Sequence, residues 1–383
     1  MSNAANVPDT APRTDAPDLV RDELGPRFAE RAAAHDRDGA FVDANWADLR
    51  EHELFWMAIP RELGGGGAPY AAVCDTIRAL GRACGSTALA YSMHTHPVAT
   101  NVFKHRRGDA GATRALEKIA GKRLVIAGTG ANDWLSSSGE AVPVDGGWRV
   151  NAHKRFVSGA PGAQLFVTSA GADAAEGRQV LHFAVPFATE GVRIVETWDA
   201  LGMRGTGSHD VMLEDVFVPE EAVVVRRPAG VWHPMWDVVL PTALPLITAA
   251  YVGIAETAAE LGRTAARKSG AAAASQVGAM DNALVTARLA LDDMVRRNDD
   301  HGFAPSQEGT QAILARKAIA TTAVEQTVAL AADLAGGKGF FRGHPLERMV
   351  RDVRAMHFHP LPVHSQETFC GRGALGLDPV EAD

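Results

Sequence analysis

The chain of 383 residues is long enough for two or three packed units, and its 46% apolar and 22% charged residues are ordinary for a globular protein. A formal net charge of -8 disfavours nucleic acid or an anionic membrane as a partner. The three cysteines are widely spaced and no run of about 18 apolar residues is found, which predicts a cytoplasmic protein without a metal site, a disulfide framework or a membrane span.

The N-terminal third predicts a tail followed by helices. Residues 1–18 are rich in Ala, Pro, Asp and Thr and contain no apolar segment, which is typical of a flexible tail rather than a signal peptide. After it, Val20, Leu24 and Phe28 recur at the four-residue spacing of one helix face. We therefore expect a helical domain over residues 19–123.

The middle of the chain changes to short strand-like segments. Runs rich in Val, Ile and Phe recur at roughly ten-residue spacing, and turns of Gly, Asp and Pro separate them. Asp145-Gly146-Gly147 suits the turn of a tight β-hairpin. The pattern predicts a small β domain over residues 124–222.

Long helices return in the last part of the chain. Heptad-like apolar rows with few helix breakers cover residues 244–269, 276–299 and 306–334, and a further helix is expected over residues 346–355. Long helices joined by short connections indicate a bundle, here over residues 235–383. The succession of helices, strands and helices predicts an α+β fold with separate domains rather than a doubly wound sheet.

Three segments resemble motifs of the acyl-CoA dehydrogenase superfamily. Residues 154–160 read Lys-Arg-Phe-Val-Ser-Gly-Ala and are similar to the family's K-x-W-I-T-N-G strand beside the flavin. Residues 201–211 are similar to its LGMRGS run, and residues 336–352 are similar to its GGxGF…PLER…RD stretch. Since their order and spacing also agree, the chain is identified as a member of this superfamily. The resemblance implies an N-terminal helical domain, a middle β-barrel-like domain and a C-terminal four-helix bundle.

The resemblance also implies a flavin cofactor, FAD or FMN, and residues that contact it. Phe156 would stack on the flavin ring, and Ser158, two residues further along a strand and so on the same face, would bond its reactive edge. The remaining residues implied as cofactor contacts are Thr129, Arg267, Gly336, Gly337 and Gly339. Taken alone, Gly336 and Gly337 are more simply interpreted as the end of a helix.

The family motif that holds the FAD diphosphate of a neighbouring subunit is incomplete in this chain. The family has Arg-x-x-Phe-Gly, whereas this sequence has Arg267-Lys268-Ser269-Gly270 and then alanines. The missing phenylalanine weakens the case for tight FAD binding and leaves the choice between FAD and FMN open. The resemblance further implies a homotetramer, a dimer of dimers, in which neighbouring subunits share the flavin site.

An acyl-CoA dehydrogenase needs a carboxylate to remove a proton from its thioester substrate. The two positions at which the family carries this glutamate fall on Pro360 and about Ala243 in this chain. Neither side chain can accept a proton. A dehydrogenase built on this sequence would need its base from elsewhere, such as Glu256 or Glu367.

Histidines suggest a different reaction. His359 directly precedes Pro360, and His94 lies in an apolar helix of the N-terminal domain. With Ser158 they resemble the catalytic set of the superfamily's flavin-dependent monooxygenases, the dibenzothiophene monooxygenase-like branch. A histidine that titrates near neutral pH can deprotonate an amine or a phenol, or donate a proton to oxygen. Ordinary structural histidines are the alternative, and His96 could face the pocket in place of His94.

We therefore expect an enzyme, a flavin-dependent oxidoreductase. A two-component monooxygenase is favoured, which would take reduced flavin from a separate flavin reductase and oxidise a small organic molecule with O2. The alternative is an acyl-CoA dehydrogenase with a non-standard base, which would pass its electrons to an electron-transfer flavoprotein. A third interpretation is a degenerate flavoprotein without catalytic activity. The sequence does not identify the substrate.

Overall fold

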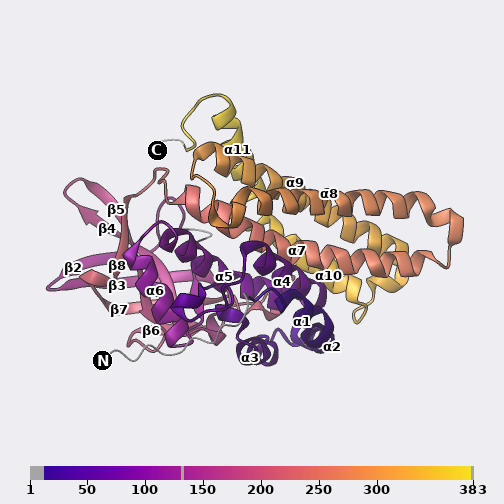
Figure 1. The fold of residues 1–383 in the computed structure, drawn as a ribbon, viewed down its shortest axis with the longest axis horizontal. Helices are drawn as coiled ribbons and strands as arrows, with labels where there is room; N and C mark the ends of the chain where they lie inside the picture. The colour runs from indigo at the N-terminus through magenta and orange to yellow at the C-terminus, as the bar shows by residue number, and fades with distance from the viewer. Residues whose placement is uncertain (1–12, 131–132, 381–383) are drawn as a thin grey trace.

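The computed structural model describes residues 13–130 and 133–380, which form three successive parts (Figure 1). A helical part comes first, a β-sheet follows it, and long helices form the C-terminal part. The sheet lies at one end of the molecule, and the long helices extend away from it (Figure 1). The predicted α+β fold with these three parts is confirmed. Most of the expected tail, residues 1–12, lies outside the described residues.

The N-terminal part is helical, as its apolar spacing predicts, and Val20, Leu24 and Phe28 are fully buried. Ala16 is buried as well and begins α1, with Pro17 in its first turn, so the flexible-tail prediction was wrong for residues 16–18. The helices of this part are α1 (Ala16–Leu19), α2 (Gly25–Asp38), α3 (Asp43–Glu51), α4 (Tyr70–Ala83), α5 (Gly85–His105) and α6 (Ala110–Gly121).

The middle part is a sheet whose strands follow the order β6-β7-β3-β2-β4-β5-β8, with β1 paired parallel to β4. The predicted hairpin joins β2 to β3 and turns at Gly146, whose φ of 74° suits glycine. The predicted domain end at residue 222 was too early, because β8 follows it and pairs with β5. The strands are β1 (Ile126–Gly128), β2 (Glu140–Val144), β3 (Gly147–Val157), β4 (Leu165–Ala174), β5 (Gly177–Pro186), β6 (Val192–Val195), β7 (His209–Pro219) and β8 (Val223–Pro228).

The C-terminal part is the predicted helical bundle. Its long helices run side by side, and two shorter helices pack on one of them, α9. The first long helix begins before residue 244, since Pro241 and Pro245 lie inside it without ending it. The helices are α7 (Trp236–Ala266), α8 (Ala274–Asn298), α9 (Gln307–Ala335), α10 (Pro345–Val353) and α11 (Val363–Ala374).

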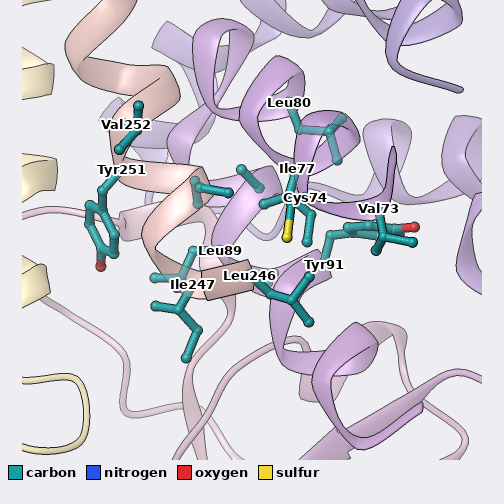
Figure 2. Packing of buried hydrophobic residues seen from close by; sticks show 14 of the residues in the cluster. Val73, Cys74, Ile77, Leu80, Leu89, Tyr91, Leu246, Ile247, Tyr251 and Val252 are labelled. Carbon is teal, nitrogen blue, oxygen red and sulfur yellow. The ribbon is translucent and has the colours of Figure 1, made fainter. Parts of the chain in front are cut away.

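Helix α7 is the centre of the molecule, because it packs against α8 and α9 and also against α4 and α5. Figure 2 shows apolar side chains from α4, α5 and α7 interleaved at this contact, among them Ile77, Leu89 and Leu246. Two glycines let α4 and α7 approach: a Cβ on Gly81 would lie 2.2 Å from a backbone oxygen of α7, and one on Gly253 would lie 2.1 Å from a backbone oxygen of α4. The backbones of the two helices are therefore in direct contact.

Helix α7 also contains a long apolar stretch, although no such stretch was predicted. Residues 238–255 contain no charged side chain, and by length and composition α7 is the one helix among the described residues that could cross a membrane. However, 89% of its most apolar window is buried inside the protein. The prediction that the chain has no run of about 18 apolar residues was therefore wrong, and the apolar residues of α7 form the core.

Candidate active site

Strand β3 ends in a bulge that carries Phe156, and Ser158 follows directly after the strand. Its pairing with β7 shifts register between Lys154 and Val157, and Phe156 within the bulge has a φ of 60°. The Phe156 side chain is 50% exposed, with its ring 6.3 Å from the ring of Trp198, whereas Ser158 is buried. Because a bulge interrupts strand alternation, the prediction of one regular face for Phe156 and Ser158 was wrong. The exposed ring still offers a flat apolar surface that fits a flavin.

Ser158 is the end of a buried chain of hydroxyl groups. Its Oγ lies 2.7 Å from the Oγ of Ser208, which lies 2.7 Å from the Oγ1 of Thr206. Thr206 in turn donates to the carbonyl oxygen of Met203, at 2.9 Å. Sequence reasoning gave Thr206 and Ser208 no role, although their place in the motif at residues 201–211 was a signal.

The turn that carries these hydroxyls is held by α10. Met203 has a φ of 54°, and its N–H donates to Oδ1 of Asp352 at 2.6 Å. Gly202 lies directly against Arg351, where a Cβ would meet the carbonyl oxygen at 2.3 Å. Burial raises the pKa of Asp352 to about 6. Two motifs that lie far apart in the sequence therefore form one structural unit.

A polar pocket of about 340 Å³ lies beside β3. It is lined by Thr129, Gly130, Asp133, Ser138, His153 and Arg155. Lys154 anchors this wall from the buried side, since its Nζ donates to Asp133 at 2.9 Å and to the carbonyl oxygen of Ser138 at 2.6 Å. Burial lowers the pKa of Lys154, and the charge of Asp133 opposes that shift. Thr129, a predicted cofactor contact, thus lines a polar pocket beside β3.

His359 lies in the segment after α10 and bonds to the central helix. Its Nε2 is 2.6 Å from the hydroxyl of Tyr251. Lys317, which is buried, donates to the carbonyl oxygens of His359 and Leu361 at 3.3 Å and 3.1 Å and so fixes this segment. Burial, and then the charge of Lys317, lower the pKa of His359 to about 3. The expectation that His359 titrates near neutral pH was wrong, and a neutral imidazole faces a neutral phenol.

His94 is fully buried and has both ring nitrogens bound by the backbone. Its Nε2 donates to the carbonyl oxygen of Phe55 at 2.8 Å, and its Nδ1 accepts from the N–H of Ile126 at 2.9 Å. Burial lowers its pKa to about 4. The predicted catalytic role of His94 is not supported, because no nitrogen is left for a substrate; the side chain joins α5 to β1. His96 bonds the carbonyl oxygen of Ser92 through Nδ1 at 3.2 Å, which leaves Nε2 as an acceptor.

Arg267 directly follows α7 and the glycine segment directly follows α9, two long helices that extend away from the sheet (Figure 1). Arg267 follows α7, whose 31 residues span about 45 Å. Gly336 ends α9 with a φ of 60°, so the simpler interpretation of Gly336 and Gly337 as a helix end is confirmed. One chain cannot place Arg267, Gly336, Gly337 or Gly339 against a flavin beside Ser158. Their predicted cofactor contacts would require a neighbouring copy.

The glutamates that could replace the missing dehydrogenase base are not free in the interior. Glu256 is 5% exposed and accepts hydrogen bonds from Arg82 at 3.2 Å and from Arg288 at 2.8 Å. Glu367 is exposed on α11. The carboxylate of Glu256 is thus occupied by two guanidinium groups, and that of Glu367 lies on the surface.

Comparison with known proteins agrees with this architecture. Models of the acyl-CoA dehydrogenase N-terminal, middle and C-terminal domains match residues 11–118, 128–216 and 246–362. A pigment production hydroxylase of Rhodococcus sp. is 30% identical, over 96% of this chain and 99% of its own. The amino sugar nitrososynthase RubN8 of Streptomyces rubradiris is 29% identical, over 92% and 88%. Proteins named as acyl-CoA dehydrogenases also match, at 25–28% identity.

A solved structure extends the likeness to the cofactor. KijD3, in complex with FMN and a dTDP-linked 3-amino-4-keto sugar, has a TM-score of 0.86 at 28% identity, covering 97% of this chain and 96% of that one. The residues present fit a flavin. The exposed ring of Phe156 offers a flat apolar surface, Ser158 offers a hydroxyl group, and a polar pocket lies at Thr129. The chain belongs to the acyl-CoA dehydrogenase superfamily and is a flavin-dependent oxidoreductase.

Proposed function

We propose that this protein is the oxygenase of a two-component system, which oxidises a small organic substrate with O2 and with reduced flavin from a separate reductase. One observation carries the proposal: the neutral pair Tyr251–His359 lies directly beside Pro360, one of the two positions at which the family resemblance expects the dehydrogenase glutamate. The two glutamates that might have substituted, Glu256 and Glu367, are ion-paired and exposed, respectively. The thioester reaction lacks its base.

The names of the relatives favour an amine or a phenol as the reacting group. One is a nitrososynthase of amino sugars and another is a hydroxylase, names that denote formation of a nitroso group and of a hydroxyl group. KijD3 was crystallised with an amino sugar nucleotide. A substrate with an N–H or an O–H group also suits the hydroxyl oxygen of Tyr251, which can accept a hydrogen bond from it.

The residues of this chain have separable roles in the proposed reaction. When bound, the reduced flavin supplies the two electrons that O2 requires. Phe156 would cover the ring of the bound flavin, and Ser158 would bond its reactive edge. The Tyr251 hydroxyl donates a hydrogen bond to His359 and accepts one from the substrate through its oxygen. Because both partners are neutral, the pair orients the substrate without placing a charge in the buried site.

FMN is the flavin that we propose, and a neighbouring subunit would complete its site. The incomplete Arg-x-x-Phe-Gly motif at Arg267 and the FMN bound to KijD3 both support FMN over FAD. A homotetramer would bring Arg267 and Gly336 of a neighbour toward the cofactor. Beside that glycine segment, Phe340 and Phe341 are 88% and 72% exposed, and a subunit contact would cover them.

An acyl-CoA dehydrogenase with a non-standard base is the second candidate. The match to proteins of that name, at 25–28% identity, favours it. It would require Glu256 to leave both Arg82 and Arg288, which is costly for a carboxylate that is 5% exposed.

Oxygen incorporation tests the proposal. A flavin reductase, NADH and FMN supply reduced FMN to the protein under ¹⁸O2, with a panel of amino sugars, aliphatic amines and phenols. The expected result is a product that carries ¹⁸O, and a fall of about 100-fold in its yield for His359→Ala with FMN binding retained. Reduction of bound flavin by an acyl-CoA without O2, with an enoyl-CoA formed, would contradict the proposal.

A further inference from the structure

The hydroxyl chain that ends at Ser158 has one favourable direction. A hydroxyl group donates a single proton. The Oγ1 of Thr206 lies 2.9 Å from the carbonyl oxygen of Met203. That oxygen also accepts from the N–H of Thr206 at 3.1 Å and from Nε1 of Trp198 at 3.0 Å, and it has no proton to give. If no proton lay between these oxygens, two acceptors would face each other at hydrogen-bond distance, which is repulsive. Thr206 therefore gives its proton to Met203.

The direction of the hydrogen bond from Thr206 determines the direction of the two remaining hydrogen bonds. Thr206 has no second proton to give, so its 2.7 Å contact with Ser208 requires the proton of Ser208. Ser208 can then only accept in its 2.7 Å contact with Ser158, which supplies that proton. The three residues are 0%, 3% and 9% exposed, so water does not compete for these bonds. The oxygen of Ser158 can therefore only accept a hydrogen bond from any other partner.

We propose that Thr206 and Ser208 are positioning residues that make Ser158 a hydrogen-bond acceptor and thereby select reduced flavin. Reduced flavin has a hydrogen on N5, which an acceptor can bind, whereas N5 of oxidised flavin has only a lone pair, which an acceptor repels. The inference rests on the proposed placement of the flavin edge at Ser158. Selection of the reduced form suits an oxygenase that must capture reduced flavin from a reductase and release it once oxidised.

Thr206→Val tests the direction of the chain because it keeps the shape of the side chain and removes the hydroxyl. The proton of Ser208 would then turn to Ser158, and Ser158 would present its own proton to N5. Anaerobic titrations with oxidised and with reduced FMN measure the two dissociation constants. The ratio of the oxidised to the reduced constant should fall by about tenfold or more. The midpoint potential of bound FMN should fall by about 30 mV for each tenfold.

Matched variants separate this effect from general damage to the fold. Thr206→Ser keeps the hydroxyl and should keep the ratio. In a Ser158→Ala background, Thr206→Val should change the ratio no further, because the effect passes through Ser158. Ser208→Ala, which frees the Ser158 hydroxyl to rotate, should also lower the ratio and serves if Thr206→Val does not fold.

An unchanged ratio in both Thr206→Val and Ser208→Ala would overturn the relay, and so would an equal change when Ser158 is alanine. Either result leaves the oxygenase proposal standing if wild-type protein binds FMN and forms ¹⁸O-labelled product. Failure of the wild-type protein to bind reduced FMN overturns both proposals, so the two failures are distinguishable.

Discussion

The hydroxyl of Tyr251 lies 2.6 Å from Nε2 of His359 and joins the middle of α7 to the segment after α10. Tyr251 projects from α7 on the side away from the packed residues Ile77 and Leu80, toward the C-terminal segment (Figure 2). Lys317 holds that segment by two backbone carbonyl oxygens. Most residues of α7 are buried, so the pair is built on a helix that is fixed in the core.

Tyr251→Phe should uncouple the proposed reaction. Without the hydroxyl, His359 loses its partner and the substrate loses an acceptor, so labelled product per NADH should fall by about 10- to 100-fold while H2O2 rises. Mass spectrometry of the product and a peroxide assay measure both quantities.

Tyr91→Phe is the matched control for that variant. The buried hydroxyl of Tyr91 donates to the carbonyl oxygen of Leu54 at 2.5 Å, away from His359. Its loss should lower the free energy of unfolding by about 1 kcal/mol and leave the ratio of product to peroxide unchanged. Equal uncoupling in both tyrosine variants would contradict the role given to Tyr251.

His94 should contribute to acid sensitivity. Its pKa is lowered from 6.5 to about 4 in the folded protein, so between these values the unfolded chain binds a proton that the folded protein does not. The stabilisation is complete above pH 6.5 and is lost as the pH falls toward 4, by about 3 kcal/mol in all.

His94→Gln removes that proton uptake from the unfolded chain. Urea unfolding should show the variant less stable than the wild type at pH 8, with the gap narrowed by about 2 kcal/mol at pH 5. His364→Gln, at an exposed position, should leave the pH profile unchanged. The same gap at both pH values for His94→Gln would show that His94 is not held neutral by burial.

Gly81→Ala should destabilise the contact between α4 and α7. The new methyl group would lie 2.2 Å from the carbonyl oxygen of Ala250, and the two backbones must separate at a cost of about 1–3 kcal/mol. Gly278→Ala in α8 meets nothing within 4 Å and should instead stabilise the helix by about 0.5–1 kcal/mol. Thermal unfolding of both variants checks the difference in sign, and a neutral Gly81→Ala would contradict the close approach.

Replacement of one partner of the Lys154–Asp133 ion pair should lower the free energy of unfolding. Both side chains are buried and 2.9 Å apart, so Lys154→Met leaves an uncompensated carboxylate and should cost about 3–5 kcal/mol. The double variant Lys154→Met with Asp133→Asn should recover part of that loss. FMN affinity should fall in the single variant, because Asp133 lines the pocket beside Thr129. Additive losses in the double variant would contradict a coupled buried pair.

The elements with regular apolar spacing could be predicted from the sequence. Val20, Leu24 and Phe28 mark a buried helix face, and Gly146 marks a hairpin, because each depends on local backbone geometry. The bulge at Phe156 could not be predicted, since it arises from the register between β3 and β7, which lie far apart in the sequence.

The site residues divide in the same way. The sequence predicts the same catalytic role for His94 and His359, and only their surroundings in the fold distinguish the two residues. The backbone takes both nitrogens of His94, whereas His359 bonds a side chain beside Pro360. The hydroxyl chain behind Ser158 was missed because it joins two motifs across the fold, and the resemblance suggested a contact for one member alone.

The most direct test of the central claim is anaerobic. Protein loaded with oxidised FMN is mixed with straight-chain and branched acyl-CoAs in the absence of O2, and the flavin absorbance is followed. We predict an unchanged spectrum and no enoyl-CoA, because Pro360 and Ala243 provide no base and Glu256 is held by two arginines. Rapid bleaching of the flavin with formation of an enoyl-CoA would contradict it.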